Sequence, residues 1–109
     1  FFFVTSMPEE VKTKADFDQC LKDNQKVVVD FTASWCGPCK MIGPKFAAME
    51  SEYPTLKFIK VDVDDNAETA EWAQIQAMPT FKCYIDGKEA DTFTSADAAK
   101  LKAMLEKAK

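Results

Sequence analysis

The sequence predicts one α/β domain in which a mixed central β-sheet is flanked by helices on both faces. The chain has 109 residues, which is the length of a single domain. Short β-branched apolar segments alternate with segments of helical periodicity, a pattern typical of parallel strands joined by right-handed crossovers. Two strand-like segments near the C-terminus are separated only by Asp86-Gly87, which predicts an antiparallel hairpin.

The expected order of elements is β-α-β-α-β-α-β-β-α. Strands are expected at 9–12, 26–31, 56–63 and 79–85, with a last strand after the turn at 86–87. Helices are expected over 14–24, from the segment 35–39 to about 53, over 65–72, and from Ser95 to 108.

The first half of the chain carries clear helix and strand signals. Thr13 can cap a helix in which Phe17, Cys20 and Leu21 share one face. The segment 26–31 is β-branched and nearly continuous, as in a strand that is buried on both faces.

Turn and capping residues mark the elements of the second half. Asp65 and Glu68 have the spacing of a capping box, so a helix is expected to begin there. Pro79 cannot donate a hydrogen bond to a neighbouring strand and therefore fits the first position of one. Ser95 is expected to cap the last helix, whose apolar residues follow a period of 3.6.

Composition excludes several kinds of chemistry. The net charge of −4 disfavours binding to nucleic acid or to an anionic membrane surface. The sequence contains no histidine, which removes Ser-His and Cys-His catalysis, histidine-ligated zinc and histidine pH switching. The chemistry is therefore expected from carboxylates, lysines or the four cysteines.

The N-terminal segment is interpreted separately from the domain at 8–109. Residues 1–7 are set apart as an N-terminal extension or an expression remnant. Met7 is expected to be the natural start, with residues 1–6 as the remnant, and a native extension is the alternative. The run Phe1-Phe2-Phe3-Val4 is too short for a signal-peptide core and has no basic region before it. No apolar run approaches the roughly 18 residues that span a bilayer. Without a secretory signal, a cytoplasmic location is expected, where thiols are kept reduced.

Cys36 and Cys39 are spaced for redox chemistry between a predicted strand and a predicted helix start. Free N–H groups and the helix dipole favour a thiolate at Cys36, and Cys39 lies one turn later, within reach of a disulfide. Pro38 suits the first helical turn, and Gly37 is expected to let the backbone turn tightly. Cys36 is therefore expected to attack a substrate disulfide, and Cys39 to resolve the mixed disulfide.

Metal ligation is the main alternative for this pair. A structural zinc needs four ligands, and Cys20 and Cys83 are expected to pack in the core as small hydrophobic residues. A cluster that bridges two chains stays open, but no metal site is predicted. A permanent structural disulfide is disfavoured because so short a loop removes little entropy from the unfolded chain.

Several spaced motifs together resemble the thioredoxin family, from about residue 9 to the end. They are Val29-Asp30-Phe31, the segment Ala33–Ile42 with Trp35-Cys36-Gly37-Pro38-Cys39, Pro44, Lys60–Asp64, Met78-Pro79-Thr80-Phe81 and Asp86-Gly87. Thr32 is similar to the residue of eukaryotic cytosolic members. A fungal origin fits this resemblance, and fungal members include cross-reactive allergens.

The resemblance implies a thioredoxin fold and a protein-disulfide reductase. Such a chain is an electron carrier that binds no cofactor and cycles between the Cys36/Cys39 dithiol and disulfide. Its implied partners are disulfide-containing proteins and an NADPH-dependent thioredoxin reductase, and it is expected to be a monomer. The alternative is a redox-insensitive interaction module of the same fold, which would not need the intact cysteine pair or Asp30. A secretory oxidant or isomerase is a further rival.

The resemblance also implies roles for residues around the cysteines. Asp30, on an apolar strand, would exchange a proton with Cys39, since burial raises the pKa of a carboxyl. Lys60 would lie near that carboxylate, although a strand lysine often only extends to solvent. The expected binding residues are Trp35, Gly37, Pro38, Lys60, Met78 and Pro79.

The Met78–Pro79 bond is implied to be cis, in a loop that faces the cysteines. The backbone N–H and C=O of Met78 would pair with a substrate chain as with an added strand. Asp62, Asp64 and Asp65 are interpreted as a solvated face. Ser95 stands where the family usually has glycine, close to the substrate loop.

Overall fold

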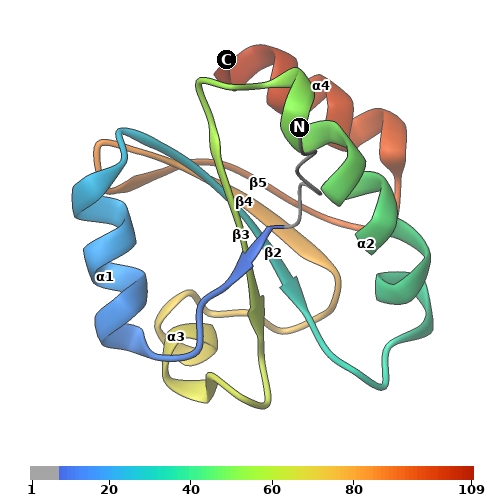
Figure 1. Cartoon of the computed structure of the whole chain (residues 1–109). Coiled ribbons are helices and arrows are strands. Elements are labelled where there is room, and N and C mark those ends of the chain that lie inside the picture. Colours follow the sequence, from blue (N-terminus) through green and yellow to red (C-terminus); the bar gives the residue numbers. More distant parts are fainter. Residues whose placement is uncertain (1–7) are drawn as a thin grey trace, which may run out of the picture.

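The computed structural model describes residues 8–109, which form a five-stranded sheet between two layers of helices (Figure 1). The strands are β1 (Glu9–Glu10), β2 (Lys26–Thr32), β3 (Lys57–Asp62), β4 (Thr80–Ile85) and β5 (Lys88–Thr94). The helices are α1 (Lys14–Asp23), α2 (Gly37–Met49), α3 (Ala67–Trp72) and α4 (Ala98–Ala108), with the short 3-10 helix η1 (Glu50–Glu52) after α2. The predictions for residues 1–7 lie outside the described residues.

The sheet is mixed, as predicted. Its strand order is β1-β3-β2-β4-β5. β3 pairs in parallel with β1 and β2, whereas β4 pairs in antiparallel fashion with β2 and β5. The register of β2 and β3 places Asp30 beside Lys60. The predicted fold class and order of elements are therefore confirmed.

Helices α1 and α3 cover one face of the sheet, and α2 and α4 cover the other (Figure 1). Alternate residues of β2 point to opposite faces, so this strand supplies both cores. Val27, Val29 and Phe31 join the core beneath α1, whereas Val28 joins the core beneath α2 and α4. All four are fully buried, which confirms the prediction of a strand covered on both faces.

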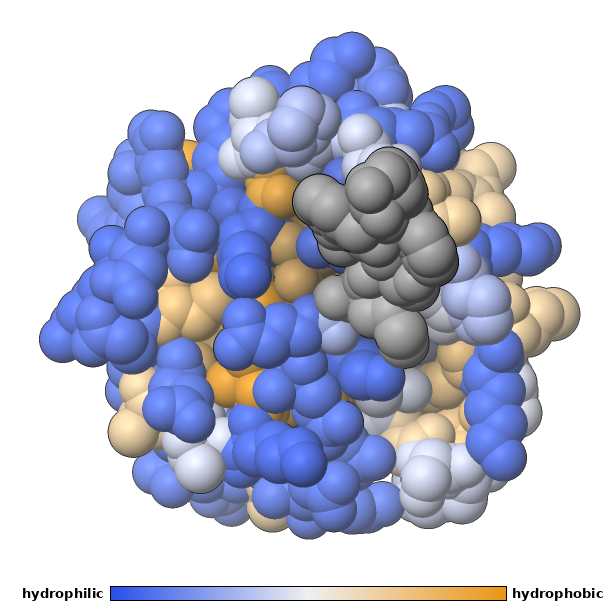
Figure 2. Space-filling model, viewed as in Figure 1, coloured by the Kyte–Doolittle hydropathy of each residue, from blue (hydrophilic) through white to orange (hydrophobic). Residues whose placement is uncertain are grey.

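The face of the folded chain that Figure 2 shows is mainly polar. In Figure 2, hydrophilic residues cover most of the face that is seen, and apolar residues are visible in the hollows between elements. No helix in the part of the chain that the structure describes is long and apolar enough to cross a membrane.

The hairpin between β4 and β5 follows the predicted two-residue turn. Asp86 and Gly87 have φ angles of 54° and 81°, so both lie in the left-handed region. Glycine adopts this region without steric cost, and aspartate tolerates it better than most residues. A register shift between Cys83 and Tyr84 was not predicted. It is a local irregularity in an otherwise regular ladder.

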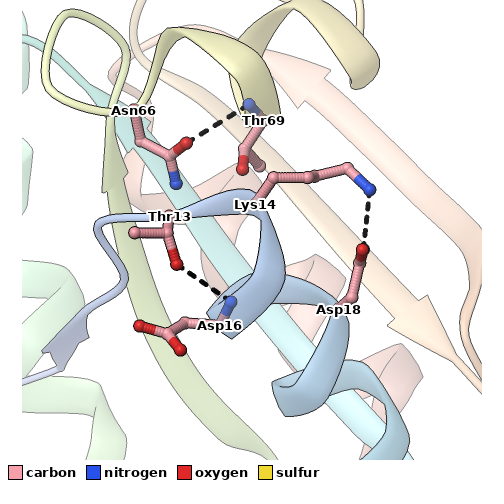
Figure 3. Close-up of polar contacts among 6 residues, drawn as sticks. All are labelled: Thr13, Lys14, Asp16, Asp18, Asn66 and Thr69. Atoms are coloured by element: carbon pink, nitrogen blue, oxygen red, sulfur yellow. Dashed lines mark hydrogen bonds and ion pairs between the residues drawn. The ribbon is translucent and has the colours of Figure 1, made fainter.

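Two predicted helix caps are wrong by one or two residues. α3 is capped by Asn66, not Asp65: the Asn66 side chain accepts the N–H of Thr69 at 3.3 Å (Figure 3). Its amide also donates to the carbonyl of Val11 at 3.1 Å, a tertiary contact that a carboxylate could not make. α4 is capped by Asp97, not Ser95, because β5 and the bend after it extend the chain past Ser95. The Thr13 cap of α1 is confirmed, with the N–H of Asp16 at 3.0 Å.

Other element ends differ slightly from the predictions. β1 is shorter than the expected strand at 9–12, although the N–H of Val11 still donates to the carbonyl of Lys60 at 2.9 Å. The helix expected to reach about 53 is α2 followed by η1, so its last turn tightens to 3-10 geometry.

Replacing Asp97 with alanine is expected to lower the free energy of unfolding by about 1 kcal/mol. The reason is that its carboxylate accepts the N–H groups of Ala99 and Lys100 at 2.9 and 3.1 Å. Urea denaturation measures the loss. Ser95→Ala is the matched control, because the Ser95 hydroxyl is buried without a hydrogen-bond partner among residues 8–109. A larger loss for Ser95→Ala would return the capping role to Ser95.

Candidate active site

The two central cysteines form a disulfide at the start of α2. Cys36 is the N-cap of the helix, and its Cα lies 5.3 Å from that of Cys39. The N–H of Cys39 points at the Cys36 sulfur, with nitrogen and sulfur 3.2 Å apart. Pro38 occupies the first helical turn, where its missing N–H leaves no hydrogen bond unmade. An anionic sulfur at residue 36 would thus meet a free N–H group and the positive end of the helix dipole.

Both cysteines are buried, and they share the same surroundings. Cys36 is 5% exposed and Cys39 is 3% exposed, so even the outer cysteine is largely covered in the disulfide form. Both pack with Ala33 in a small apolar cluster to which Met78 contributes. The pair is therefore shielded from most of the solvent, and an attacking group must approach over a restricted surface.

Gly37 does not have the role that the sequence suggested. Gly37 is the first residue of α2, and its φ is not among the positive values found in residues 8–109. A Cβ built at this position would meet no atom within 4 Å. The expectation that glycine is needed for a tight turn is thus wrong. The space beside Gly37 is open, which leaves room for a partner next to Cys36.

The loop before β4 reaches the cysteine pair. The Met78–Pro79 bond is cis, as the resemblance implied. The carbonyl oxygen of Met78 lies 3.7 Å from the Cys36 sulfur. The fold therefore places Met78 beside the cysteine pair, although 42 residues separate it from Cys36 in the sequence.

Asp30 is a buried carboxyl on β2, beneath the same pair. Its side chain is nearly enclosed at 3% exposure, and within residues 8–109 its Oδ1 has no hydrogen-bond partner. Burial raises the pKa of Asp30 from 3.8 to about 7, and the positive charge of Lys60 acts in the opposite direction. A carboxyl with this pKa can both hold and release a proton near neutrality.

A cavity connects Asp30, Cys39 and Lys60. It has a volume of about 680 Å³, and all three residues line it. Lys60 is half-buried beside Asp30 in the register of β2 and β3. Lys60 therefore lies next to Asp30, as the resemblance implied, and does not only extend to solvent.

Trp35 lies on the surface next to the cysteines, with 66% of its area exposed. Its indole N–H donates to the Asp64 carboxylate at 2.8 Å. The Asp62 carboxylate in turn accepts the N–H groups of Asp64 and Asp65 at 2.8 and 3.1 Å. Sequence reasoning treated these aspartates as a solvated face and missed this contact. The spacing of Asp62 and Asp64 could have indicated the turn but not the tryptophan, which is 29 residues away.

The other two cysteines lie away from the site. Cys83 is 1% exposed in the core under α2 and α4, as predicted. Cys20 is only half-buried on α1, so its prediction as a core residue is partly wrong. Burial raises the pKa of both thiols, which keeps them protonated at neutral pH. Because they sit on opposite faces of the sheet, they cannot pair within one chain.

The described residues also contain no group of three or more histidine, cysteine, aspartate or glutamate side chains that could hold a metal ion.

Comparison with known proteins agrees with this geometry. Residues 8–107 match the family model described as Thioredoxin. The chain is 56% identical over 102 residues to the thioredoxin of Geodia cydonium, covering 91% of this chain and 96% of that protein. The solved structure of Fasciola hepatica thioredoxin matches with a TM-score of 0.90 and 42% identity, over 93% of this chain and 99% of that one.

A second solved structure, the thioredoxin of Malassezia sympodialis, matches with a TM-score of 0.90 and 36% identity. The match covers 99% of this chain and 96% of that one, which is described as a member of a pan-allergen family. These similarities confirm the thioredoxin fold. Since the cysteine pair, its helix and its facing loop are all in place, the chain belongs to the thioredoxin family and is a thiol-disulfide oxidoreductase.

Proposed function

We propose that this oxidoreductase acts as a protein-disulfide reductase in which Cys36 attacks the substrate and Cys39 resolves the intermediate. The observation that carries this assignment is the place of Cys36 at the N-cap of α2, with the N–H of Cys39 directed at its sulfur. Only the first sulfur has both the N–H group and the helix dipole to stabilise a thiolate. The assignment gives the two cysteines different tasks.

In the first step, the reduced chain presents the Cys36 thiolate to a substrate disulfide. The thiolate attacks one substrate sulfur, a bond forms between that sulfur and Cys36, and the other substrate sulfur leaves as a thiolate. The open space beside Gly37 and the exposed ring of Trp35 offer an approach to Cys36. Pro38 borders the same approach at the first turn of α2.

In the second step, Cys39 attacks Cys36 and releases the second substrate thiolate. The Cys39 thiol must lose its proton first, and Asp30 is the group that takes it. A carboxyl with a pKa of about 7 accepts a proton at neutral pH without holding it permanently. The cavity that Asp30 and Cys39 share has room for water to carry the proton between them. Lys60, beside Asp30, keeps the carboxylate form accessible.

Substrate docking is assigned to the loop that contains Met78 and Pro79. The carbonyl of Met78 is already 3.7 Å from the Cys36 sulfur, so an extended substrate segment paired with this backbone would bring its disulfide to the nucleophile. Together with Trp35, the loop forms the contact surface for disulfide-containing proteins.

Each cycle leaves the chain oxidised, and two electrons must then return to it. We assign this step to an NADPH-dependent thioredoxin reductase, as in the family that the chain belongs to. The chain is proposed to work as a monomer in the cytosol. The low exposure of Cys83 argues against a cross-linked dimer through that thiol, and free thiols such as Cys20 and Cys83 are typical of a reducing compartment.

Insulin reduction with NADPH and thioredoxin reductase tests this function. The chain is expected to couple NADPH consumption to cleavage of the insulin disulfides over many turnovers. Cys20→Ser should keep the rate, because Cys20 lies on α1 away from the site. If a chemical dithiol drives the chain but the reductase does not, the assigned electron donor is wrong. If the disulfide form oxidises reduced proteins faster than the dithiol form reduces insulin, the proposed direction is wrong.

A further inference from the structure

Two threonine hydroxyls anchor the loop before β4, and the steps above do not use them. Thr80 is the first residue of β4 and is 5% exposed. Its Oγ1 donates to the carbonyl oxygen of Ala77 at 2.7 Å. It also lies 2.9 Å from the Oγ1 of Thr94, which is the register partner of Thr80 on β5.

The direction of the second hydrogen bond follows from counting protons. A threonine hydroxyl has one proton to donate and two lone pairs to accept with. The proton of Thr80 lies on its bond to Ala77, so Thr94 must be the donor between the two threonines. The result is a directed chain from Thr94 to Thr80 to the carbonyl of Ala77. In such a chain each bond polarises and strengthens the next.

This series of hydrogen bonds fixes the orientation of the Met78 N–H as well as that of the Ala77 carbonyl. The Ala77 C=O and the Met78 N–H belong to one planar peptide unit, so the direction of the carbonyl fixes that of the N–H. In trans geometry the two groups point in opposite directions, and the only cis bond in residues 8–109 is the next one, Met78–Pro79. The Met78 N–H has no acceptor among the described residues. The Met78 N–H is therefore a free donor, and the hydrogen bond from Thr80 to the Ala77 carbonyl fixes its direction.

We propose that Thr94 is a positioning residue for the substrate. Through Thr80 it holds the Ala77–Met78 peptide unit so that the Met78 N–H can donate a hydrogen bond to a backbone carbonyl of the docking substrate segment. This inference rests on the docking role proposed for Met78 above. It makes Thr94 a determinant of substrate affinity and not of sulfur reactivity, since Thr94 contacts neither cysteine in the structure's hydrogen-bond network.

Thr94 can be changed without opening the core, because it is exposed on an edge strand. Thr94→Val keeps the shape and the strand preference of threonine but removes the proton. Thr94→Ser keeps the proton. Thr92→Val is the matched control: Thr92 is exposed two residues earlier on the same strand, and its hydroxyl makes no hydrogen bond to the described residues.

The test is single-turnover reduction of insulin by the pre-reduced chain, which leaves the reductase out of the measurement. For Thr94→Val, the insulin concentration that gives half the limiting rate is expected to rise about fivefold, the typical effect of one net hydrogen bond. The limiting rate, and the rate at which iodoacetamide alkylates Cys36, should stay at wild-type values. Thr94→Ser should restore the affinity, and Thr92→Val should not change it.

Each other outcome overturns the inference in a recognisable way. Wild-type affinity in Thr94→Val would mean that the hydroxyl positions nothing. A loss that Thr94→Ser does not repair would assign the effect to shape and not to the proton. Slower alkylation of Cys36 would show a disturbance of the redox pair itself. If the wild-type chain failed to reduce insulin, the proposed function would be overturned first, and this inference with it.

Discussion

Replacing Cys36 with serine is expected to abolish insulin reduction, with the rate falling by roughly a thousandfold or more. A serine hydroxyl at the N-cap of α2 would still accept the N–H of Cys39, so the fold at this point should persist. It cannot attack a disulfide, however, and the remaining thiol at Cys39 is 3% exposed. The coupled assay with NADPH and thioredoxin reductase measures the loss.

The matched variant Cys39→Ser separates the two steps. It retains the Cys36 thiolate and should attack the substrate normally, but it has no second thiol with which to release it. A mixed disulfide between Cys36 and the substrate is therefore expected to accumulate, and non-reducing electrophoresis with mass spectrometry detects it. Trapping by Cys36→Ser instead of Cys39→Ser would reverse the two assigned tasks.

The sequence was sufficient to predict the features of the site that depend on local spacing. Cys36 and Cys39 occupy the first turn of a helix because a buried strand ends at Thr32 and a helical segment with Pro38 follows. Asp30 could be identified because it interrupts a strand whose neighbours are all buried. These predictions needed only the periods of strands and helices and the preferences of a helix N-terminus.

The features that the sequence did not reveal depend on contacts between distant segments. Asn66 caps α3 in preference to Asp65 because its amide can also bind the carbonyl of Val11, which is 55 residues away. The bonds of Trp35 to Asp64 and of Thr94 to Thr80 likewise join residues that only the fold brings together. Local spacing shows that such groups can form hydrogen bonds but does not show with which partner.

Gly37 illustrates a different limit of sequence reasoning. Glycine is often required where the backbone is strained or crowded, and the prediction for Gly37 assumed a tight turn. The structure shows an ordinary helical position with open space beside it. Within the chain itself nothing described crowds this position, so the open space beside Gly37 is available to a molecule that approaches Cys36.

Replacing Asp30 with asparagine is expected to stabilise the protein at pH 8. Burial raises the pKa of Asp30 in the folded chain from 3.8 to about 7. A shift of about three pH units corresponds to about 4 kcal/mol at most, so a gain of about 2–4 kcal/mol is expected. Urea denaturation of the disulfide form at several pH values measures it.

The gain should depend on pH in a defined direction. At pH 8 the carboxyl is ionised in both the folded and the unfolded chain, so the whole cost of burying its charge opposes folding. Below about pH 4 it is protonated in both states, and the cost disappears. Between these limits the folded chain binds more protons than the unfolded chain, so wild-type stability falls as the pH rises. The advantage of Asp30→Asn should therefore vanish toward pH 4.

Two further variants connect this stability cost to the buried charge. Asp65→Asn removes an exposed carboxyl and should change stability little at any pH in this range. Lys60→Gln removes the positive charge that lowers the pKa of Asp30, so the fall in stability should extend to higher pH. If Asp30→Asn changed the stability of the protein equally at every pH, the cause would be packing and not the ionisation of Asp30. The carboxyl would then titrate like an exposed one, and it would lose the property that suits it to accept the proton of Cys39.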